Sequence, residues 1–177
     1  MEGRDTNIRD LIEIDGYYYT EGYPNSNCRM FFEDGMWVSF SFQWGTTENE
    51  SKSNMLKYIG KWTEKKQVRW GDFWGVYKIV NDTLVVYRYM KGSFWAVWSL
   101  YEEKYKIIDK RTIKRVSYSG LLKADHNSCK VLNEDYFYVA ADSLPTSDCW
   151  LKEEKWIWRN EQDWKNYMEK IKQNKQH

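Results

Sequence analysis

Residues that interrupt or cross-link a chain are scarce in this sequence of 177 residues, which has 2 prolines and 3 cysteines. The few prolines, and the lack of any low-complexity run, leave no obvious linker, so we expect one domain over residues 1–177. The cysteines, Cys28, Cys129 and Cys149, match no metal-binding or redox spacing, and we expect no metal and no cofactor. Cys129 and Cys149 could form a disulfide only in an oxidising compartment; in a reducing one all three would be small buried side chains.

An excess of charge of one sign is also missing, because 27 basic residues face 26 acidic ones and the formal net charge is +1. Without surplus Lys or Arg to neutralise phosphates, we expect no nucleic-acid partner. No hydrophobic run approaches the ~18 residues of a membrane-spanning helix, so no such segment is expected. The polar start from Met1 to Asp5 is not typical of a signal peptide. A chain whose targeting segment had been removed would start in the same way, so the localisation stays open.

Familiar catalytic motifs are absent as well: there is no Gly-rich phosphate loop, HExxH or GxSxG. Residues 125–129 (Asp-His-Asn-Ser-Cys) place a base beside nucleophiles, but triad members meet in space from separate segments, which favours a polar loop here. The acidic pairs Glu102-Glu103, Glu134-Asp135 and Glu153-Glu154 are expected in charged turns or at strand ends, in contact with water. We therefore expect no enzyme, and keep a hydrolase built on His126 as the third alternative.

What the sequence does contain is an unusual share of aromatic residues, 18%, with 11 Trp and 14 Tyr. Aromatic side chains fill strands and cores. They also line pockets and interfaces, because they bury a large area with few rotatable bonds.

Runs rich in β-branched and aromatic residues follow one another from Phe73 to Val116. Short polar turns separate them, as at Asn81-Asp82. This pattern predicts consecutive antiparallel hairpins with too little room for helices. The expected strands of this central meander are 73–80, 83–90, 94–101, 104–108 and 112–116.

An earlier hairpin, with strands 29–33 and 36–42, is predicted around Asp34-Gly35, a dipeptide that tolerates positive φ. A two-residue turn there would pair Phe31 with Val38. Val38, Phe40 and Phe42 would then share one apolar face. Further strands are expected at 11–19, 56–62, 136–140 and 150–158, with a loose polar start over residues 1–10 and a long connection over residues 119–134.

The strands on either side of Asn81-Asp82 are apolar on both faces, so each face must be covered. The barrel interior would cover the face that carries Tyr77, Ile79, Leu84 and Val86. The other must be covered by a helix or by a second subunit, and a C-terminal helix over residues 160–173 is expected there. Asn160 is its N-cap, and its apolar stripe at helical spacing consists of Trp164, Tyr167, Met168 and Ile171.

We therefore predict a mainly β fold: an antiparallel up-and-down β-barrel of about 8–10 strands over residues 11–158, with the amphipathic helix packed outside. A barrel of this size either holds a small ligand or is filled by its own side chains. Strand alternation gives the rings that are expected to point inward and line a ligand site: Tyr18, Phe40, Phe42, Tyr58, Trp62, Tyr77, Trp98 and Tyr105.

The chain resembles the lipocalin-like (calycin) proteins, particularly uncharacterised lipocalin-like proteins of Bacteroidetes bacteria. The residues that carry the resemblance are Asp15-Gly16-Tyr17-Tyr18, Phe32-Glu33-Asp34-Gly35, residues 75–79 with 81–84, and residues 105–109 with Thr112-Ile113. The lipocalin first-strand motif is Gly-x-Trp, and Tyr18 holds the Trp position here. The resemblance implies a barrel open at one end, non-enzymatic binding of small apolar molecules, and an exported protein, periplasmic or lipid-anchored in the cell envelope.

We expect a non-enzymatic protein that binds a small hydrophobic or aromatic ligand inside its barrel, as a monomer or weak homodimer. The alternative is an interaction protein of the cell envelope whose barrel is filled and whose surface aromatics bind a protein or a glycan. An interior cavity of about 300 Å³ or more would favour the first.

Overall fold

The computed structural model describes residues 7–20, 26–42, 73–91, 98–121, 129–142, 144–158 and 160–174. The chain divides into two compact units, Met1–Ser147 and Asp148–His177, and each is described by itself. The expectation of a single domain stays a prediction. The expected strand at 56–62 lies outside the described residues.

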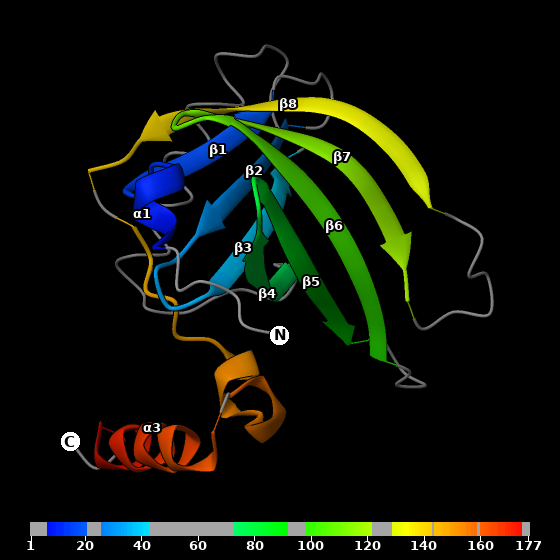
Figure 1. Ribbon diagram of the computed structural model, residues 1–177. Coiled ribbons are helices and arrows are strands. Elements are labelled where there is room, and N and C mark those ends of the chain that lie inside the picture. Colours follow the sequence, from blue (N-terminus) through cyan, green and yellow to red (C-terminus); the bar gives the residue numbers. More distant parts are fainter. Residues whose placement is uncertain are drawn as a thin grey trace. The chain divides into compact units, whose positions relative to one another are not determined.

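The first unit is a closed β-barrel in which each strand is antiparallel to the next and the last strand pairs with the first (Figure 1). Closure joins Tyr17 to Val139 and Tyr18 to Tyr138, so each of the strands that the structure describes has a neighbour on both sides. The predicted up-and-down barrel is confirmed. In chain order the strands are β1 Gly16–Thr20, β2 Ser26–Phe31, β3 Met36–Phe42, β4 Phe73–Val80, β5 Thr83–Lys91, β6 Trp98–Asp109, β7 Thr112–Gly120 and β8 Lys130–Ala140.

A short helix, α1 Ile8–Leu11, precedes the barrel and lies beside the end at which β8 finishes and β7 begins (Figure 1). The loose start predicted for residues 1–10 is therefore wrong from Ile8 onward. Asn7 caps the helix by accepting a hydrogen bond from the Arg9 amide at 3.0 Å. The spacing of Ile8 and Ile12 places both on the buried side, and each is nearly inaccessible to solvent.

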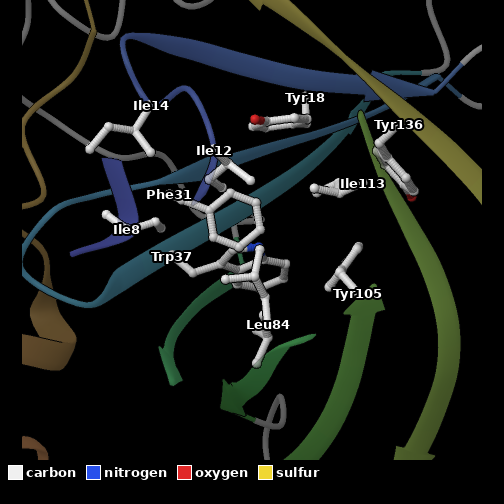
Figure 2. Packing of buried hydrophobic residues seen from close by; sticks show 11 residues of the cluster. Ile8, Ile12, Ile14, Tyr18, Phe31, Trp37, Leu84, Tyr105, Ile113 and Tyr136 are labelled. Atoms are coloured by element: carbon white, nitrogen blue, oxygen red, sulfur yellow. The ribbon is translucent and has the colours of Figure 1, made fainter. Parts of the chain in front are cut away.

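The core lies inside the barrel next to α1, and Figure 2 shows its residues converging from the helix and from several strands. Phe31 is near its centre, with edge-on contacts to Tyr18, Tyr77 and Tyr105 at ring-centroid distances of 5.9, 5.5 and 6.2 Å. Burial of each large side chain stabilises the fold by about 1.5–3 kcal/mol before entropy is counted. The buried cluster consists of Ile8, Ile12, Ile14, Tyr18, Phe31, Trp37, Leu84, Val86, Tyr105, Ile113 and Tyr136.

The central hairpin β4–β5 forms as predicted. Asn81 adopts a positive φ of 57° in the tight turn. The register pairs Ile79 with Leu84 and Tyr77 with Val86, and these residues face the barrel core.

The hairpin at Asp34-Gly35 differs from its prediction by one residue. Phe31 pairs with Trp37, not with Val38. The reason is a three-residue loop closed by the bond from the Phe32 amide to the Met36 carbonyl, with Gly35 at φ 85°. Because side chains alternate along a strand, this shift turns Trp37 and Ser39 toward the face that Phe31 occupies.

The strands β6, β7 and β8 are longer in the structure than in the prediction. The expected strands 94–101 and 104–108, with a turn at Glu102-Glu103, are one strand from Trp98 to Asp109, and residues 92–97 lie outside the described residues. The predicted connection 119–134 is shorter, because β7 runs to Gly120 and β8 begins at Lys130. The charged residues in these segments suggested turns, but the segments pair with neighbouring strands, and that pairing determines their structure.

The second unit contains two 3-10 helices, η1 Trp150–Glu153 and η2 Lys155–Ile157, where a strand was predicted over 150–158; that prediction is wrong. The indole nitrogens of Trp158 and Trp164 donate to the carbonyls of Lys152 and Glu153 at 2.8 and 2.9 Å, which holds these turns together.

The predicted C-terminal helix is present as α3 Glu161–Asn174. Asn160 is its N-cap, because its side-chain oxygen accepts a hydrogen bond from the Asp163 amide at 2.8 Å. The expected packing of this helix against the outside of the barrel stays a prediction. Within the described ranges, no helix combines the length and apolar character that crossing a membrane requires.

Candidate binding site in the barrel interior

Three of the rings predicted to line a site, Tyr18, Tyr77 and Tyr105, have described side chains, and all three contact Phe31 inside the barrel. The Tyr18 hydroxyl shares its one hydrogen between the carbonyls of Glu13 and Lys110, each at 3.0 Å, and the Tyr77 hydroxyl donates to the carbonyl of Phe32 at 2.7 Å. Burial raises the pKa of both hydroxyls, so they stay protonated. These rings build the packed core beside α1.

The other predicted lining residues remain predictions. Phe40 and Phe42 belong to β3, and Trp98 to β6, but their side chains lie outside the described part of the structure. Tyr58 and Trp62 lie outside it entirely.

Beyond the core, the inner face of β5 and β6 changes from apolar to charged and aromatic. Leu84, Tyr105, Val86 and Glu103 are fully buried, whereas Arg88 and Tyr101 are partly accessible. Along the barrel axis, with increasing distance from α1, the interior therefore changes from an apolar layer to a charged layer and then to a partly accessible aromatic one. The successive cross-strand pairs are Leu84 with Tyr105, Val86 with Glu103, and Arg88 with Tyr101.

Glu103 is the centre of this charged region and has no exposed surface. Its Oε2 atom lies 3.1 Å from Arg115 Nε and accepts a hydrogen bond from the Tyr105 hydroxyl at 2.6 Å. Its Oε1 atom lies 3.5 Å from Arg88 Nη1. Burial acts to raise the pKa of the Glu103 carboxyl, but the positive charges of Arg29, Arg115 and Arg88 outweigh it, and the pKa is lowered. Glu103 is therefore ionised at neutral pH.

Arg29 enters the same region from β2 and is 3% exposed. Its Nε atom donates to the Tyr105 hydroxyl at 2.8 Å, and its Nη1 atom donates to Ser39 at 2.6 Å and to the Cys28 carbonyl at 3.0 Å. Its guanidinium carbon also lies 5.6 Å from the Trp37 ring centroid and 5.2 Å from the Tyr136 ring centroid. Arg29 therefore reaches the Glu103 carboxylate through the Tyr105 hydroxyl.

Glu134, on β8, completes the set. Its carboxylate lies 3.2 Å from Arg115 Nη1, and its side chain is 39% exposed. Arg115 thus bridges the buried Glu103 and the partly solvated Glu134. We call Arg29, Arg88, Glu103, Arg115 and Glu134 the interior charge cluster.

Aromatic rings surround the cluster on the side away from α1. The guanidinium carbon of Arg88 lies 4.7, 4.9 and 5.5 Å from the ring centroids of Phe73, Tyr101 and Tyr118. Tyr101 and Tyr118 stack with centroids 5.2 Å apart, and all three rings are partly exposed. We call Phe73, Arg88, Tyr101 and Tyr118 the aromatic end; it lies near the strand ends at Phe73, Lys91 and Gly120.

Sequence reasoning missed this cluster because Glu103 was expected in an exposed turn. That expectation is wrong, since Glu103 lies in the middle of β6. A signal was present: in one continuous strand, Tyr101, Glu103 and Tyr105 alternate and share a face. Two aromatic neighbours on that face mark the carboxylate as inward.

The cysteines, a metal site and His126 were the other candidates for chemistry in the sequence. None of the cysteines in the described residues forms a disulfide, and the pairing of Cys129 with Cys149 would join different units, so it stays a prediction. No group of three or more His, Cys, Asp or Glu suited to a metal ion occurs within the described ranges. His126 lies outside the described residues.

Comparisons with protein-family models, with curated proteins and with solved structures found no match to this chain.

Proposed function

We propose that this chain is a lipocalin-like protein that binds a small hydrophobic or aromatic molecule without chemical conversion, at the aromatic end of its barrel interior. The observation that carries the proposal is the contrast between the two ends. Beside α1 the interior is packed around a cluster of buried side chains, whereas Tyr101 and Tyr118, on the same inner surface, are partly exposed. At the second end a ligand would find a stacked pair of partly solvated rings beside a buried charge.

The geometry of these rings suits a flat apolar ligand. The Tyr101 and Tyr118 rings are stacked at an interplanar angle of 14°, so together they present one flat, partly exposed aromatic surface. Arg88 holds them in place, because its Nη2 atom donates to the Tyr118 hydroxyl at 3.2 Å. Rings fixed in this way lose little conformational entropy when a ligand binds.

Titration with the fluorescent apolar probe N-phenyl-1-naphthylamine tests the proposal. The probe should bind saturably, and Tyr118→Ala should weaken its binding by about 10-fold, the value of one lost aromatic contact. Phe137→Ala is the matched control, because Phe137 is a β8 ring that is 48% exposed and next to the buried Tyr136. Failure of the probe to bind, or equal weakening by the two variants, would overturn the proposal.

The second candidate is an interaction protein of the cell envelope that binds a protein or glycan through surface aromatics. Its support is the exposure of Trp150 and Trp156, at 37% and 52%, in the second unit. Under this alternative, Trp156→Ala would abolish retention on a glycan array or a partner pull-down, and Tyr118→Ala would not.

A further inference from the structure

The interior charge cluster holds more positive than negative charge. Arg88 and Arg115 have side chains that are 13% exposed, and Arg29 is 3% exposed. Against these guanidinium groups stands one fully buried carboxylate, Glu103; the other, Glu134, is 39% exposed and shares its charge with water. Among the described residues, the cluster is therefore positive in its most buried part.

The remaining acidic groups around the cluster do not correct this imbalance. Tyr105 and Tyr136 contact Arg29, and burial raises the pKa of both hydroxyls, so they stay neutral. The backbone carbonyl of Cys28 accepts a hydrogen bond from Arg29, and burial raises the pKa of the Cys28 thiol. Uncompensated charge away from water is unfavourable, and a bound counter-ion would relieve it.

Arg88 is the cation best placed to receive such a group. Its contact with Glu103, at 3.5 Å, is longer than that of Arg115, at 3.1 Å. Arg88 Nε, Arg115 Nε and Glu103 Oε1 are all buried, and none makes a hydrogen bond among the described residues. Arg115 also pairs with Glu134, whereas Arg88 has Glu103 alone as a carboxylate partner among the described residues. Arg88 also lies among the rings of the aromatic end, where Phe73 is its nearest ring.

We propose that the ligand carries an anionic group, a carboxylate or a sulfonate, that pairs with Arg88 while its apolar part covers the rings of the aromatic end. This inference rests on the proposed function and narrows it to amphipathic anions. A planar oxyanion suits the guanidinium fork, and a charge-assisted hydrogen bond at a site of low dielectric contributes more than a neutral one.

The test compares two probes that share one aromatic skeleton: 1-anilinonaphthalene-8-sulfonate and N-phenyl-1-naphthylamine, which lacks the sulfonate. We expect the wild-type protein to bind the sulfonate about 10-fold more tightly at low salt. Arg88→Gln should lower this affinity ratio by about 10-fold, and Arg88→Lys, which keeps the charge, should retain most of it. Arg111→Gln is the matched control, because Arg111 is an exposed arginine that lies over a ring, that of Tyr138.

The outcomes separate the inference from the function on which it rests. If the wild-type protein binds the two probes equally, the inference of an anionic group is overturned and the proposed function stands. The same conclusion follows if Arg88→Gln leaves the ratio of the two affinities unchanged. Failure of both probes to bind would overturn both. Should Arg88→Gln not fold, displacement of the neutral probe from the wild-type protein decides: dodecanoate must compete about 10-fold better than dodecanol.

Discussion

The Tyr105 hydroxyl joins Arg29 to Glu103 inside the barrel, accepting a hydrogen bond from Arg29 Nε at 2.8 Å and donating one to Glu103 Oε2 at 2.6 Å. The three residues come from β2 and β6, strands that are not neighbours in the sheet. This relay therefore connects opposite walls of the barrel through its interior.

Tyr105→Phe should destabilise the protein by about 2–3 kcal/mol, because it removes two hydrogen bonds to charged groups in a buried site. Urea unfolding followed by tryptophan fluorescence measures the change. Tyr138→Phe is the control: the Tyr138 ring packs edge-on against Tyr18, but its hydroxyl makes no hydrogen bond among the described residues. A loss of the same size in both variants would contradict the relay.

Glu103→Gln should cost about 3–5 kcal/mol of unfolding free energy, because it leaves buried guanidinium groups without their central carboxylate. Chemical denaturation at neutral pH gives the value. Asp135→Asn removes an acid from β8 that pairs with Lys114 at 3.2 Å on the exposed side, and should change stability by less than about 1 kcal/mol. Similar values for the two variants would contradict the central role of Glu103.

The pH dependence of stability should reflect the lowered pKa of Glu103. A group whose pKa is lower in the folded state stabilises the fold above its unfolded pKa, near 4.5, and this contribution is lost as the pH falls through the folded pKa. The wild-type protein should therefore lose stability steeply below about pH 4.5, and Glu103→Gln should show a shallower slope. Thermal unfolding between pH 7 and pH 3 measures both, and parallel slopes would contradict the assignment.

Gly75→Ala should destabilise the barrel by about 1–3 kcal/mol, because a Cβ at this position would overlap the backbone carbonyl oxygen of Tyr87 on the neighbouring strand. Gly120→Ala is the control. There the nearest atoms, on the Tyr101 ring, are 3.6 Å away, an ordinary contact. Its effect should stay within about 0.5 kcal/mol. Thermal melts of the two variants decide the matter, and a stable Gly75→Ala protein would show that β4 and β5 can separate locally.

Asn160→Ala should loosen the first turn of α3 by about 1 kcal/mol, since the Asn160 side chain is the acceptor for the Asp163 amide. Hydrogen exchange at that amide should become several-fold faster. Gln162→Ala removes a side chain that donates to Asn166 within the same helix and should leave the Asp163 amide protected. An unchanged exchange rate in Asn160→Ala would contradict the cap.

The barrel and its central hairpin were predictable because local and long-range signals agree there. At Asn81-Asp82, turn chemistry and the alternation around Tyr77 and Leu84 both specify the register that forms. At Asp34-Gly35 the turn residues were correct, but two-residue and three-residue loops are both compatible with that dipeptide. Only pairing with the whole sheet selects between them, and the choice determines whether Trp37 or Val38 shares the face of Phe31.

The alternation of Tyr101, Glu103 and Tyr105 points Glu103 inward, but the partners of Glu103 in the interior charge cluster could not be predicted, for a different reason. A charged residue is most often exposed, so Glu103 appeared to end a strand. Its burial depends on Arg29, Arg88 and Arg115, which come from three other strands and are brought together only when the barrel closes. Likewise, the alternation over residues 150–158 favours a strand, but indole-to-carbonyl bonds such as that of Trp158 stabilise 3-10 turns there.

The pairing of β1 with β8 has a consequence for biosynthesis. Tyr17 meets Val139, so the ribosome must make nearly the whole first unit before its earliest strand finds that neighbour. Until then the outer edges of β1 and β7 offer unpaired amide and carbonyl groups to other nascent chains. We therefore expect fragments that stop before β8 to accumulate as aggregates, while chains that include it remain dispersed.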